Sequence, residues 1–277
     1  MTLQLAKLHG TGNDFLVTTD PLTGPHAVAL CNRFTGVGAD GLLLLEPGAD
    51  GADATMTLFN ADGSQAEMSG NGVRCLAWAA RRAGMGSPDR LVVDTGSGRR
   101  VVDLECDASG AVRRAVCDMG PVSFDPPAIP VDAASAFDLP IELDGVPTVG
   151  DAAGMGNPHL VVLVEDPDAI DVGRHGARLE ADLRFPHRVN VEFVAIVGPD
   201  ALRMRVWERG VGETQSCGTG ACAAAAVAHR RGLVGPRVVM GLPGGELDIE
   251  LGETVRLGGP VVHVFDVEVD LDRLRSP

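Results

Sequence analysis

Two short stretches of the sequence carry residue types that could accept and donate a proton at carbon. One is VGETQSCGTGACAAAAVAHRRG at 211–232, in which Cys217 lies among small residues directly ahead of an alanine-rich run. The other is GSQAEMSGNGVRCLAWAARRAG at 63–84, which has the same build and carries Ser69 at the matching position. A thiol or hydroxyl in such a setting is either a general acid or base or an inert small side chain. The elements that position it decide between the two.

Each stretch predicts a helix that starts close to the candidate residue. Alanine-rich composition favours helices over about 73–83 and 221–231, paired arginines suit their C-terminal ends, and the glycine that follows suits the C′ position. Ser69 and Cys217 are therefore expected at the N-cap or just before it. Because alanine has little bulk, such a helix is expected at the centre of a core, with strands packed closely around it.

A helix N-terminus changes the chemistry of a side chain placed there. It exposes unpaired N–H groups and carries about half a positive charge, so it is expected to lower the pKa of the Cys217 thiol and to favour the thiolate, which is the useful base. The same N–H groups can hold a carboxylate, and the glycines beside both residues allow a ligand to approach the backbone closely. Both helix starts are therefore candidate sites for an amino-acid carboxylate.

Two such helix starts facing one cleft would suffice for racemisation. A carboxylate held between them would have Cys217 on one face of its α-carbon and residue 69 on the other. Removal of the α-proton leaves a carbanion whose charge flows into the carboxylate, where two helix dipoles stabilise it best in the transition state. The competing interpretations are an inert thiol at position 217 and an ordinary N-cap serine at position 69.

Further matches show that the chain is built twice. Asn60 and Glu208 are as far apart as Ser69 and Cys217, and each follows an aromatic residue. Asn13 and Asn157 both follow glycine and are separated by almost the same interval. Several matches in the same order predict two homologous halves, because chance seldom repeats both order and spacing.

The repeat also predicts the fold class. Short β-rich runs bounded by Gly, Asp or Pro flank each helix, which indicates an α/β (α+β) chain of two pseudo-symmetric halves, each an antiparallel or mixed sheet or barrel wrapped around a central helix. The N-terminal half is expected at 1–118 and the C-terminal half at 119–261, with a proline-rich crossover at 119–132. A last strand at 262–277 is expected to return to the N-terminal half.

Composition limits the partners. The 277 residues are 45% hydrophobic and carry a formal net charge of −15, which argues against nucleic acid and against an anionic membrane surface. No apolar run reaches the roughly 18 residues of a membrane span, and no leader is evident, so a cytoplasmic protein is expected. The six cysteines show no CxxC pair and no Cys/His spacing of a zinc site, so neither a disulfide framework nor a metal is expected.

Lysine usage bears on cofactors. Lys7 is the only lysine in the chain, and it falls in a predicted edge or terminal strand with no phosphate-binding motif nearby. Pyridoxal phosphate enzymes hold their cofactor as a Schiff base to lysine. Any amino-acid chemistry is therefore expected to proceed without a cofactor.

Eight motifs, HGTGNDF, GVGADG, NADGS, GNGVRC, GNPH, RVNVEF, ERGVGET and SCGTG, together resemble the diaminopimelate epimerases, a family of cofactor-independent amino-acid racemases. The resemblance covers nearly the whole chain. It implies two pseudo-symmetric halves with the active site in the cleft between them, and a homodimer. The implied activity is isomerisation of LL-2,6-diaminopimelate to meso-2,6-diaminopimelate by two-base proton transfer, in the synthesis of lysine and peptidoglycan precursors.

The resemblance also implies roles for individual residues. Cys217 is implied as one of two catalytic acid–base thiols, with His159 and Glu208 tuning the proton-transfer pair. The implied contacts to the carboxylate at the reacting centre come from Gly70, Asn71, Gly218 and Thr219. Asn13 would help to orient the substrate, and its distal amino-acid end would be recognised by Asn60, Asn157, Asn190, Arg209 and Glu208. Each of these Asn side chains could instead bond its own backbone in a turn.

Ser69 departs from the family pattern, which has its second catalytic cysteine at this position. An alcohol is a far weaker acid than a thiol, so three explanations stand beside one another. Residue 69 was substituted to trap an inactive form, Ser69 or a water it holds acts as a weak acid, or the protein performs another reaction, such as a one-base dehydration or epimerisation of a different amino acid. An inactive amino-acid-binding homologue is the non-enzymatic alternative. The matching distal-end residues favour diaminopimelate.

Overall fold

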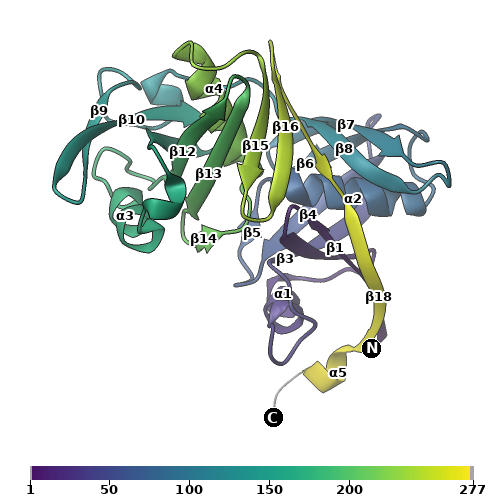
Figure 1. The fold of residues 1–277 in the computed structure, drawn as a ribbon. Helices are drawn as coiled ribbons and strands as arrows, with labels where there is room; N and C mark the ends of the chain where they lie inside the picture. Colours follow the sequence, from purple (N-terminus) through teal and green to yellow (C-terminus); the bar gives the residue numbers. More distant parts are fainter. Residues whose placement is uncertain (1, 275–277) are drawn as a thin grey trace. The chain divides into compact units, whose positions relative to one another are not determined.

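The computed structural model describes residues 2–274, which divide into two compact units (Figure 1). The first unit contains residues 2–118 together with 258–274, and the second contains 119–257. Residues 258–261 thus group with the N-terminal unit, whereas the division made on the sequence placed them in the C-terminal half.

The N-terminal unit is a mixed sheet with three helices. Its elements are β1 (Thr2–Gly10), β2 (Asn13–Thr18), α1 (Gly24–Cys31), β3 (Gly41–Pro47), β4 (Ala54–Asn60), β5 (Gln65–Ala66), α2 (Gly70–Arg82), β6 (Arg90–Thr95), β7 (Gly98–Cys106), β8 (Val112–Asp118), β18 (Val262–Asp270) and α5 (Leu271–Leu274). Strand β2 runs parallel to β3 and β4 parallel to β6, while β1–β2, β3–β4, β4–β5, β6–β7 and β7–β8 are antiparallel. Strand β1 also pairs with β18, so Lys7 lies in the terminal strand that was expected as one alternative, and this strand is not an edge strand.

The C-terminal unit repeats this plan. Its elements are η1 (Pro126–Ala128), β9 (Leu139–Leu143), β10 (Val146–Gly154), β11 (Pro158–Leu163), η2 (Pro167–Ala169), α3 (Val172–Glu180), β12 (Asn190–Gly198), β13 (Ala201–Glu208), β14 (Gly212–Thr214), α4 (Gly218–Arg230), β15 (Arg237–Leu242) and β16 (Gly245–Leu251); the chain leaves the unit within β17 (Val255–Pro260). Strand β11 runs parallel to β12 and β13 parallel to β15, while β10–β11, β12–β13, β13–β14 and β15–β16 are antiparallel.

The order of elements and the sense of each pairing therefore match between the units. The series from β1 to β7 corresponds to the series from β10 to β16, with α1 matching α3 and α2 matching α4. The match extends to the flanking strands, because β18 pairs with β1 as β9 pairs with β10. The predicted α+β fold of two pseudo-symmetric halves is confirmed. In the described residues the sheets are mixed and not closed, so the barrel alternative does not apply.

Each unit is organised around one central helix. Helix α2 contacts β1, β2, β3, β4, β6, β7 and β8, and α4 contacts β10, β11, β12, β13, β15 and β16. Every residue of α4 from 218 to 228 is buried, as its small side chains allow. The predicted central position of both helices is confirmed.

Both helices begin one turn earlier than the sequence indicated. Helix α2 starts at Gly70 and α4 at Gly218, rather than at 73 and 221, because the side chains of Ser69 and Cys217 accept hydrogen bonds from exposed backbone N–H groups of the first turn. The C-terminal ends match the expectation, since Gly84 and Gly232 follow the last turns with positive φ.

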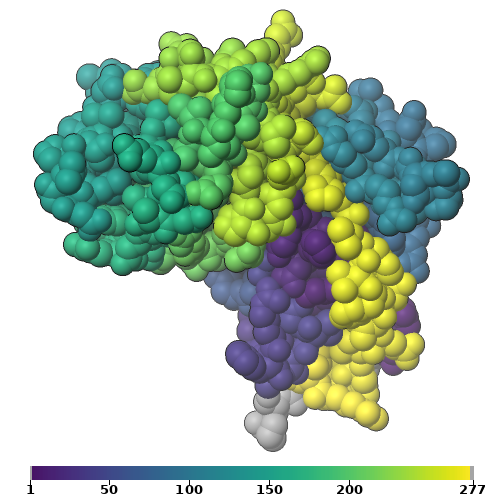
Figure 2. Space-filling view, in the orientation of Figure 1, coloured from purple at the N-terminus to yellow at the C-terminus, as the bar shows by residue number. Residues whose placement is uncertain are grey.

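The outer face of the N-terminal unit includes an exposed strand. Strand β18 (yellow in Figure 2) lies on the outside of the N-terminal unit beside β1. It exposes three large apolar side chains, Val262, Val264 and Phe265. No helix within residues 2–274 combines the length and the apolar character that a membrane crossing would need.

Candidate active site

Cys217 is the N-cap residue of α4. Its Sγ accepts a hydrogen bond from the backbone N–H of Gly220 at 3.4 Å and lies 3.5 Å from the Thr219 hydroxyl. The thiol is buried, together with Gly218, Thr219 and Gly220. The sulfur therefore occupies the helix N-terminus that the sequence predicted for it.

The pKa of this thiol is opposite to the expectation. Burial raises the pKa of Cys217 well above its ordinary value, and the charges of Glu208 and Glu192 raise it further, while the hydrogen bonds to Thr219 and the Gly220 N–H lower it only in part. The helix N-terminus was expected to lower this pKa. Desolvation and two nearby carboxyl groups outweigh it, so Cys217 holds its proton at neutral pH and rests as a proton donor.

A buried His–Glu pair lies beside the thiol. His159 Nδ1 is 2.7 Å from Glu192 Oε1, its Nε2 is 2.8 Å from Asn157 Oδ1, and both His159 and Glu192 are fully buried. Both ring nitrogens of His159 thus lie within hydrogen-bond distance of an oxygen atom, which fixes the imidazole between Glu192 and Asn157.

Glu208 completes the group around the sulfur. Burial raises its pKa and the charge of Glu192 does the same, against the hydrogen bonds from Thr214 and Cys217 and the charge of His159, and the net effect is upward. The structure thus brings together Cys217, His159 and Glu208 and adds Glu192 to them.

Glu192 was not expected from the sequence. Its signal is a lone acid between Val191 and Phe193 in strand β12, whose first six residues are all buried. A Cβ at Gly220 would lie 2.5 Å from Glu192 Oε1, so the glycine leaves room for the carboxyl against the first turn of α4. The absence of a side chain at Gly220 thus lets the Glu192 carboxyl pack against the first turn of α4.

The Asn190 side chain connects two backbone segments near this group, one of which carries Arg209. The Asn190 side chain donates to the Pro158 carbonyl at 2.9 Å and accepts from the Arg209 backbone N–H at 2.9 Å, while Arg209 Nη1 donates to the His187 carbonyl at 3.0 Å. The Asn190 amide is thus bonded to backbone on both sides. Its observed contacts fix the turn that carries Arg209.

The N-terminal unit presents a second helix start. Ser69 is the N-cap of α2, and its Oγ accepts from the backbone N–H of Gly72 at 3.0 Å. Asn60 lies at the end of β4 and donates to the Ser64 hydroxyl at 3.0 Å. Ser69 therefore caps its helix, as its residue type favours, and sits at the position equivalent to Cys217.

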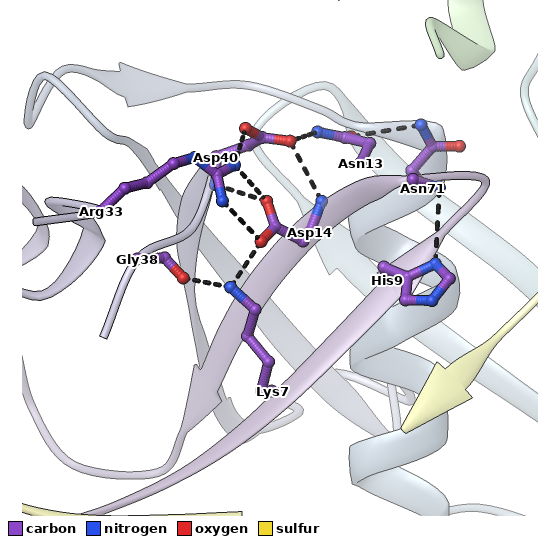
Figure 3. A network of polar contacts seen from close by, with 9 residues as sticks. Lys7, His9, Asn13, Asp14, Arg33, Gly38, Asp40 and Asn71 are labelled. Atoms are coloured by element: carbon purple, nitrogen blue, oxygen red, sulfur yellow. Dashed lines mark hydrogen bonds and ion pairs between the residues drawn. The ribbon is translucent and has the colours of Figure 1, made fainter. Parts of the chain in front are cut away.

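Two further amides are linked at this helix start (Figure 3). Asn13 Nδ2 donates to Asp40 Oδ2 at 2.7 Å, and Asn71 Nδ2 donates to Asn13 Oδ1 at 3.2 Å. Asn71 Oδ1 in turn accepts from Arg74 Nη2 at 2.9 Å. This series of hydrogen bonds runs from an anionic to a cationic side chain, so each amide has one consistent orientation.

Further charged side chains bind Asp40 and its neighbour Asp14, at the anionic end of this series of hydrogen bonds. Arg33 bonds Asp40 and Asp14 at 2.7 Å each, and Lys7 pairs with Asp14 at 2.5 Å and also donates to the Gly38 carbonyl (Figure 3). Burial alone would raise the pKa of Asp14, but the bonds from Arg33 and Lys7 lower it to about 2. The lone lysine is thus bound in an ion pair.

Arg74 was also missed by sequence reasoning. It is 0% exposed, and its Nη1 donates to the Gly70 carbonyl at 3.2 Å within α2. In the repeat its counterpart in α4 is Cys222. One helix start is therefore lined by amides and an arginine, and the other by two glutamates and a histidine.

Cys75 does not replace the missing thiol. It is fully buried within α2, and burial raises its pKa to about 12. Within residues 2–274, no cluster of His, Cys, Asp and Glu has the arrangement of a metal site.

Comparison with known proteins shows the family of the chain. The family model described as diaminopimelate epimerase matches residues 5–124 and 152–263. The chain belongs to the diaminopimelate epimerase family. It is 41% identical to the diaminopimelate epimerase of Pelotomaculum thermopropionicum, over 96% of this chain and 98% of that protein. It is 42% identical to that of Azotobacter vinelandii, over 98% of this chain and 100% of that protein.

The fold is shared more widely. A probable proline racemase from Agrobacterium radiobacter has a TM-score of 0.74 at 18% identity, covering 98% of this chain and 93% of that one. At this identity the likeness concerns the fold alone. Membership of the epimerase family follows from the similarity in sequence, and the protein is an amino-acid epimerase of that family.

Proposed function

We propose that the protein interconverts LL- and meso-2,6-diaminopimelate by moving a proton at one α-carbon without a cofactor, in lysine and peptidoglycan precursor synthesis. The observation that carries the proposal is the setting of Cys217. Its thiol stands at a helix N-terminus, burial raises its pKa, and the charges of two nearby glutamates raise that pKa further, one of which, Glu192, bonds His159. Full-length similarity to diaminopimelate epimerases supports the choice of substrate.

In this proposal the α C–H bond breaks on one face while a new one forms on the other. The thiolate of Cys217, formed when the neighbouring Glu208 takes the thiol proton, removes the α-proton from one face and becomes a thiol again. Ser69, or a water that it holds, is the weak acid that gives a proton to the opposite face, and it regains that proton from solvent. The proposal requires both helix starts to act on the same α-carbon.

In the proposal, the two ends of the substrate are recognised by separate sets of residues. The carboxylate at the reacting centre binds the backbone N–H groups of Gly70, Asn71, Gly218 and Thr219, where helix dipoles favour an anion. Asn13 orients this end. The distal amino-acid end binds a set consisting of Asn60, Asn157, Asn190, Arg209 and Glu208.

Deuterium exchange at the α-carbon tests the reaction. The protein is incubated with LL-diaminopimelate in D₂O, and α-deuterium and stereochemistry are followed together. Ser69→Cys is expected to raise the rate of epimerisation, because a thiol is a much stronger acid than an alcohol, whereas Cys217→Ala is expected to abolish exchange. Failure of Ser69→Cys to gain activity would count against the assignment. Exchange without inversion would point to one-sided chemistry, and binding without exchange to an inactive homologue.

We also propose that the protein is a cytoplasmic homodimer. Its six cysteines are free, which suits a reducing compartment. The exposed apolar side chains of β18, Val262, Val264 and Phe265, are the kind of surface that a second copy would cover. Sedimentation should then give a species of twice the 28.7 kDa chain mass, and a monomer at micromolar concentration would refute the dimer.

A further inference from the structure

Glu180 is a buried acid that the proposed chemistry does not use. It ends α3 in the C-terminal unit, and only 7% of the residue is exposed. Its carboxylate accepts from Trp207 Nε1 at 2.7 Å, from the Gly210 backbone N–H at 3.0 Å and from Arg188 Nη1 at 3.2 Å. A buried carboxylate with three donors is a costly feature, so its role needs an explanation.

Two of the three donors bracket the residues proposed to recognise substrate. Trp207 immediately precedes Glu208, and Gly210 immediately follows Arg209. The turn closes on itself through the bond from the Val211 N–H to the Glu208 carbonyl at 3.0 Å. Glu180 therefore holds this turn at both ends.

The third donor joins the turn to its neighbour. Arg188 lies two residues before Asn190, and its backbone has a φ of 59°, a conformation that non-glycine residues seldom adopt. The Asn190 side chain accepts from the Arg209 N–H at 2.9 Å. Through Arg188 on one side and the 207–210 turn on the other, Glu180 links the two segments that carry three of the proposed distal-end residues, Asn190, Glu208 and Arg209.

Helix α3 is itself tightly fixed against the strand that leads into the turn. A Cβ on Gly176 would lie 2.4 Å from the Trp207 Cβ, so the glycine brings the helix into direct contact with the tryptophan. Burial alone would raise the pKa of Glu180, but the bonds from Trp207, Gly210 and Arg188 together lower it. The carboxylate is thus held ionised in a rigid setting.

We propose that Glu180 is a positioning residue that sets the geometry of the 207–210 turn and thereby the preference for a substrate with a second amino-acid end. This rests on the proposed function, which places that end at Glu208 and Arg209. A carboxylate suits the task because it only accepts hydrogen bonds. A glutamine would bring a donor NH₂ against the same N–H groups.

The test compares the binding of two ligands to variants made in a Trp78→Phe background, in which Trp207 is the only tryptophan until it is itself replaced. The ligands are diaminopimelate and 2-aminopimelate, which lacks the distal amino group. Glu180→Gln is expected to weaken binding of diaminopimelate by about tenfold, the size of a lost hydrogen bond to a charged group, and to change binding of 2-aminopimelate by less than about threefold. Trp207 emission should shift with the loss of its bond to the carboxylate.

Asp182→Asn is the matched control. Asp182 lies two residues from Glu180 and bonds Arg184, at 2.5 Å through its side chain, with no bond to the turn among those described. It should leave both affinities and the Trp207 emission unchanged. Trp207→Phe is a second test of the same contact, because it removes the indole N–H donor and keeps an aromatic side chain. Its loss of diaminopimelate affinity should not add to that of Glu180→Gln.

The proposal is overturned if Glu180→Gln weakens both ligands equally or neither, or if the losses in the double variant multiply. Failure of the proposed function gives a different result. In that case the Trp78→Phe parent itself would not prefer diaminopimelate to 2-aminopimelate, while the emission shift on Glu180→Gln would persist.

Discussion

Cys217 stands at a helix start that favours a thiolate, in surroundings that favour the thiol. The opposing contributions are burial and the two carboxyl groups on one side, and the helix N–H and a hydroxyl on the other. Because the first set is stronger, the resting sulfur is a proton donor. Formation of the thiolate then requires a group that takes its proton, for which Glu208 is in hydrogen-bond contact, or the arrival of positive charge near the sulfur.

This balance predicts how the cysteine reacts. At pH 7.5 iodoacetamide should alkylate the exposed Cys106 first and Cys217 slowly, and the rate at Cys217 should rise as the pH is raised beyond 9, because only the thiolate reacts. Glu208→Gln removes one neighbouring carboxyl group and should speed alkylation of Cys217, by about tenfold for each unit by which its pKa falls. Peptide mapping of labelled protein measures both rates. Rapid labelling of Cys217 in the parent at pH 7.5 would contradict the protonated resting state.

At the scale of elements, the central helices owe their starts to side-chain caps. Ser69 Oγ receives the Gly72 N–H at 3.0 Å, and Cys217 Sγ receives the Gly220 N–H at 3.4 Å. The residues proposed for proton transfer thus also cap the N-terminal ends of their helices. Substitution at either position affects stability as well as chemistry.

Loss of the cap at α2 can be measured on its own. Ser69→Ala is expected to lower the free energy of unfolding by about 1 kcal/mol, the usual value of an N-cap serine. Ser69→Cys should lower it less, because sulfur can accept the same bond, as it does in α4. Chemical denaturation of the three proteins gives these differences. Equal stability of Ser69→Ala and the parent would show that the cap contributes nothing.

The elements were more predictable than the contacts that tune the site. Alanine content, terminal glycines and the N-cap residue types predicted both central helices to within one turn, and the repeat predicted the matching halves. Glu192 and Glu180 escaped because their partners, His159 for Glu192 and Trp207 and Gly210 for Glu180, are far away in sequence. Arg74 escaped because composition does not show that an arginine within a helix is buried. The pKa of Cys217 escaped for the same reason, since burial and the positions of Glu192 and Glu208 are properties of the folded chain.

At the scale of the whole molecule, the repeat has diverged mainly in charge. The N-terminal unit retains amides and Arg74 around its helix start, and the C-terminal unit has acids and His159. An anion is favoured at the first helix start and a bound proton at the second. The repeated fold therefore carries a different set of ionisable and polar groups at each helix start.

The ion pairs of the N-terminal unit predict acid sensitivity. Asp14 has a pKa of about 2 in the folded protein, against about 3.9 in an unfolded chain, so its contribution of roughly 2 kcal/mol is complete above about pH 4 and is lost as the pH falls towards 2. Asp14→Asn should destabilise the protein at pH 7, and the difference from the parent should narrow between pH 4 and 2. Asp94→Asn, which removes a surface pair with Arg99, is the control and should have little effect. A difference that stays constant with pH would refute this account.

The central claim is that position 69 and Cys217 act on opposite faces of one α-carbon. The most direct test is the early time course of the Ser69→Cys variant with LL-diaminopimelate in D₂O, with isotope content measured separately in substrate and product. We predict that deuterium enters the meso product at the inverted centre while the remaining LL substrate stays unlabelled, since the base that takes the proton is not the acid that returns one. Equal labelling of recovered substrate and product would mean that a single group serves both faces, and would contradict the claim.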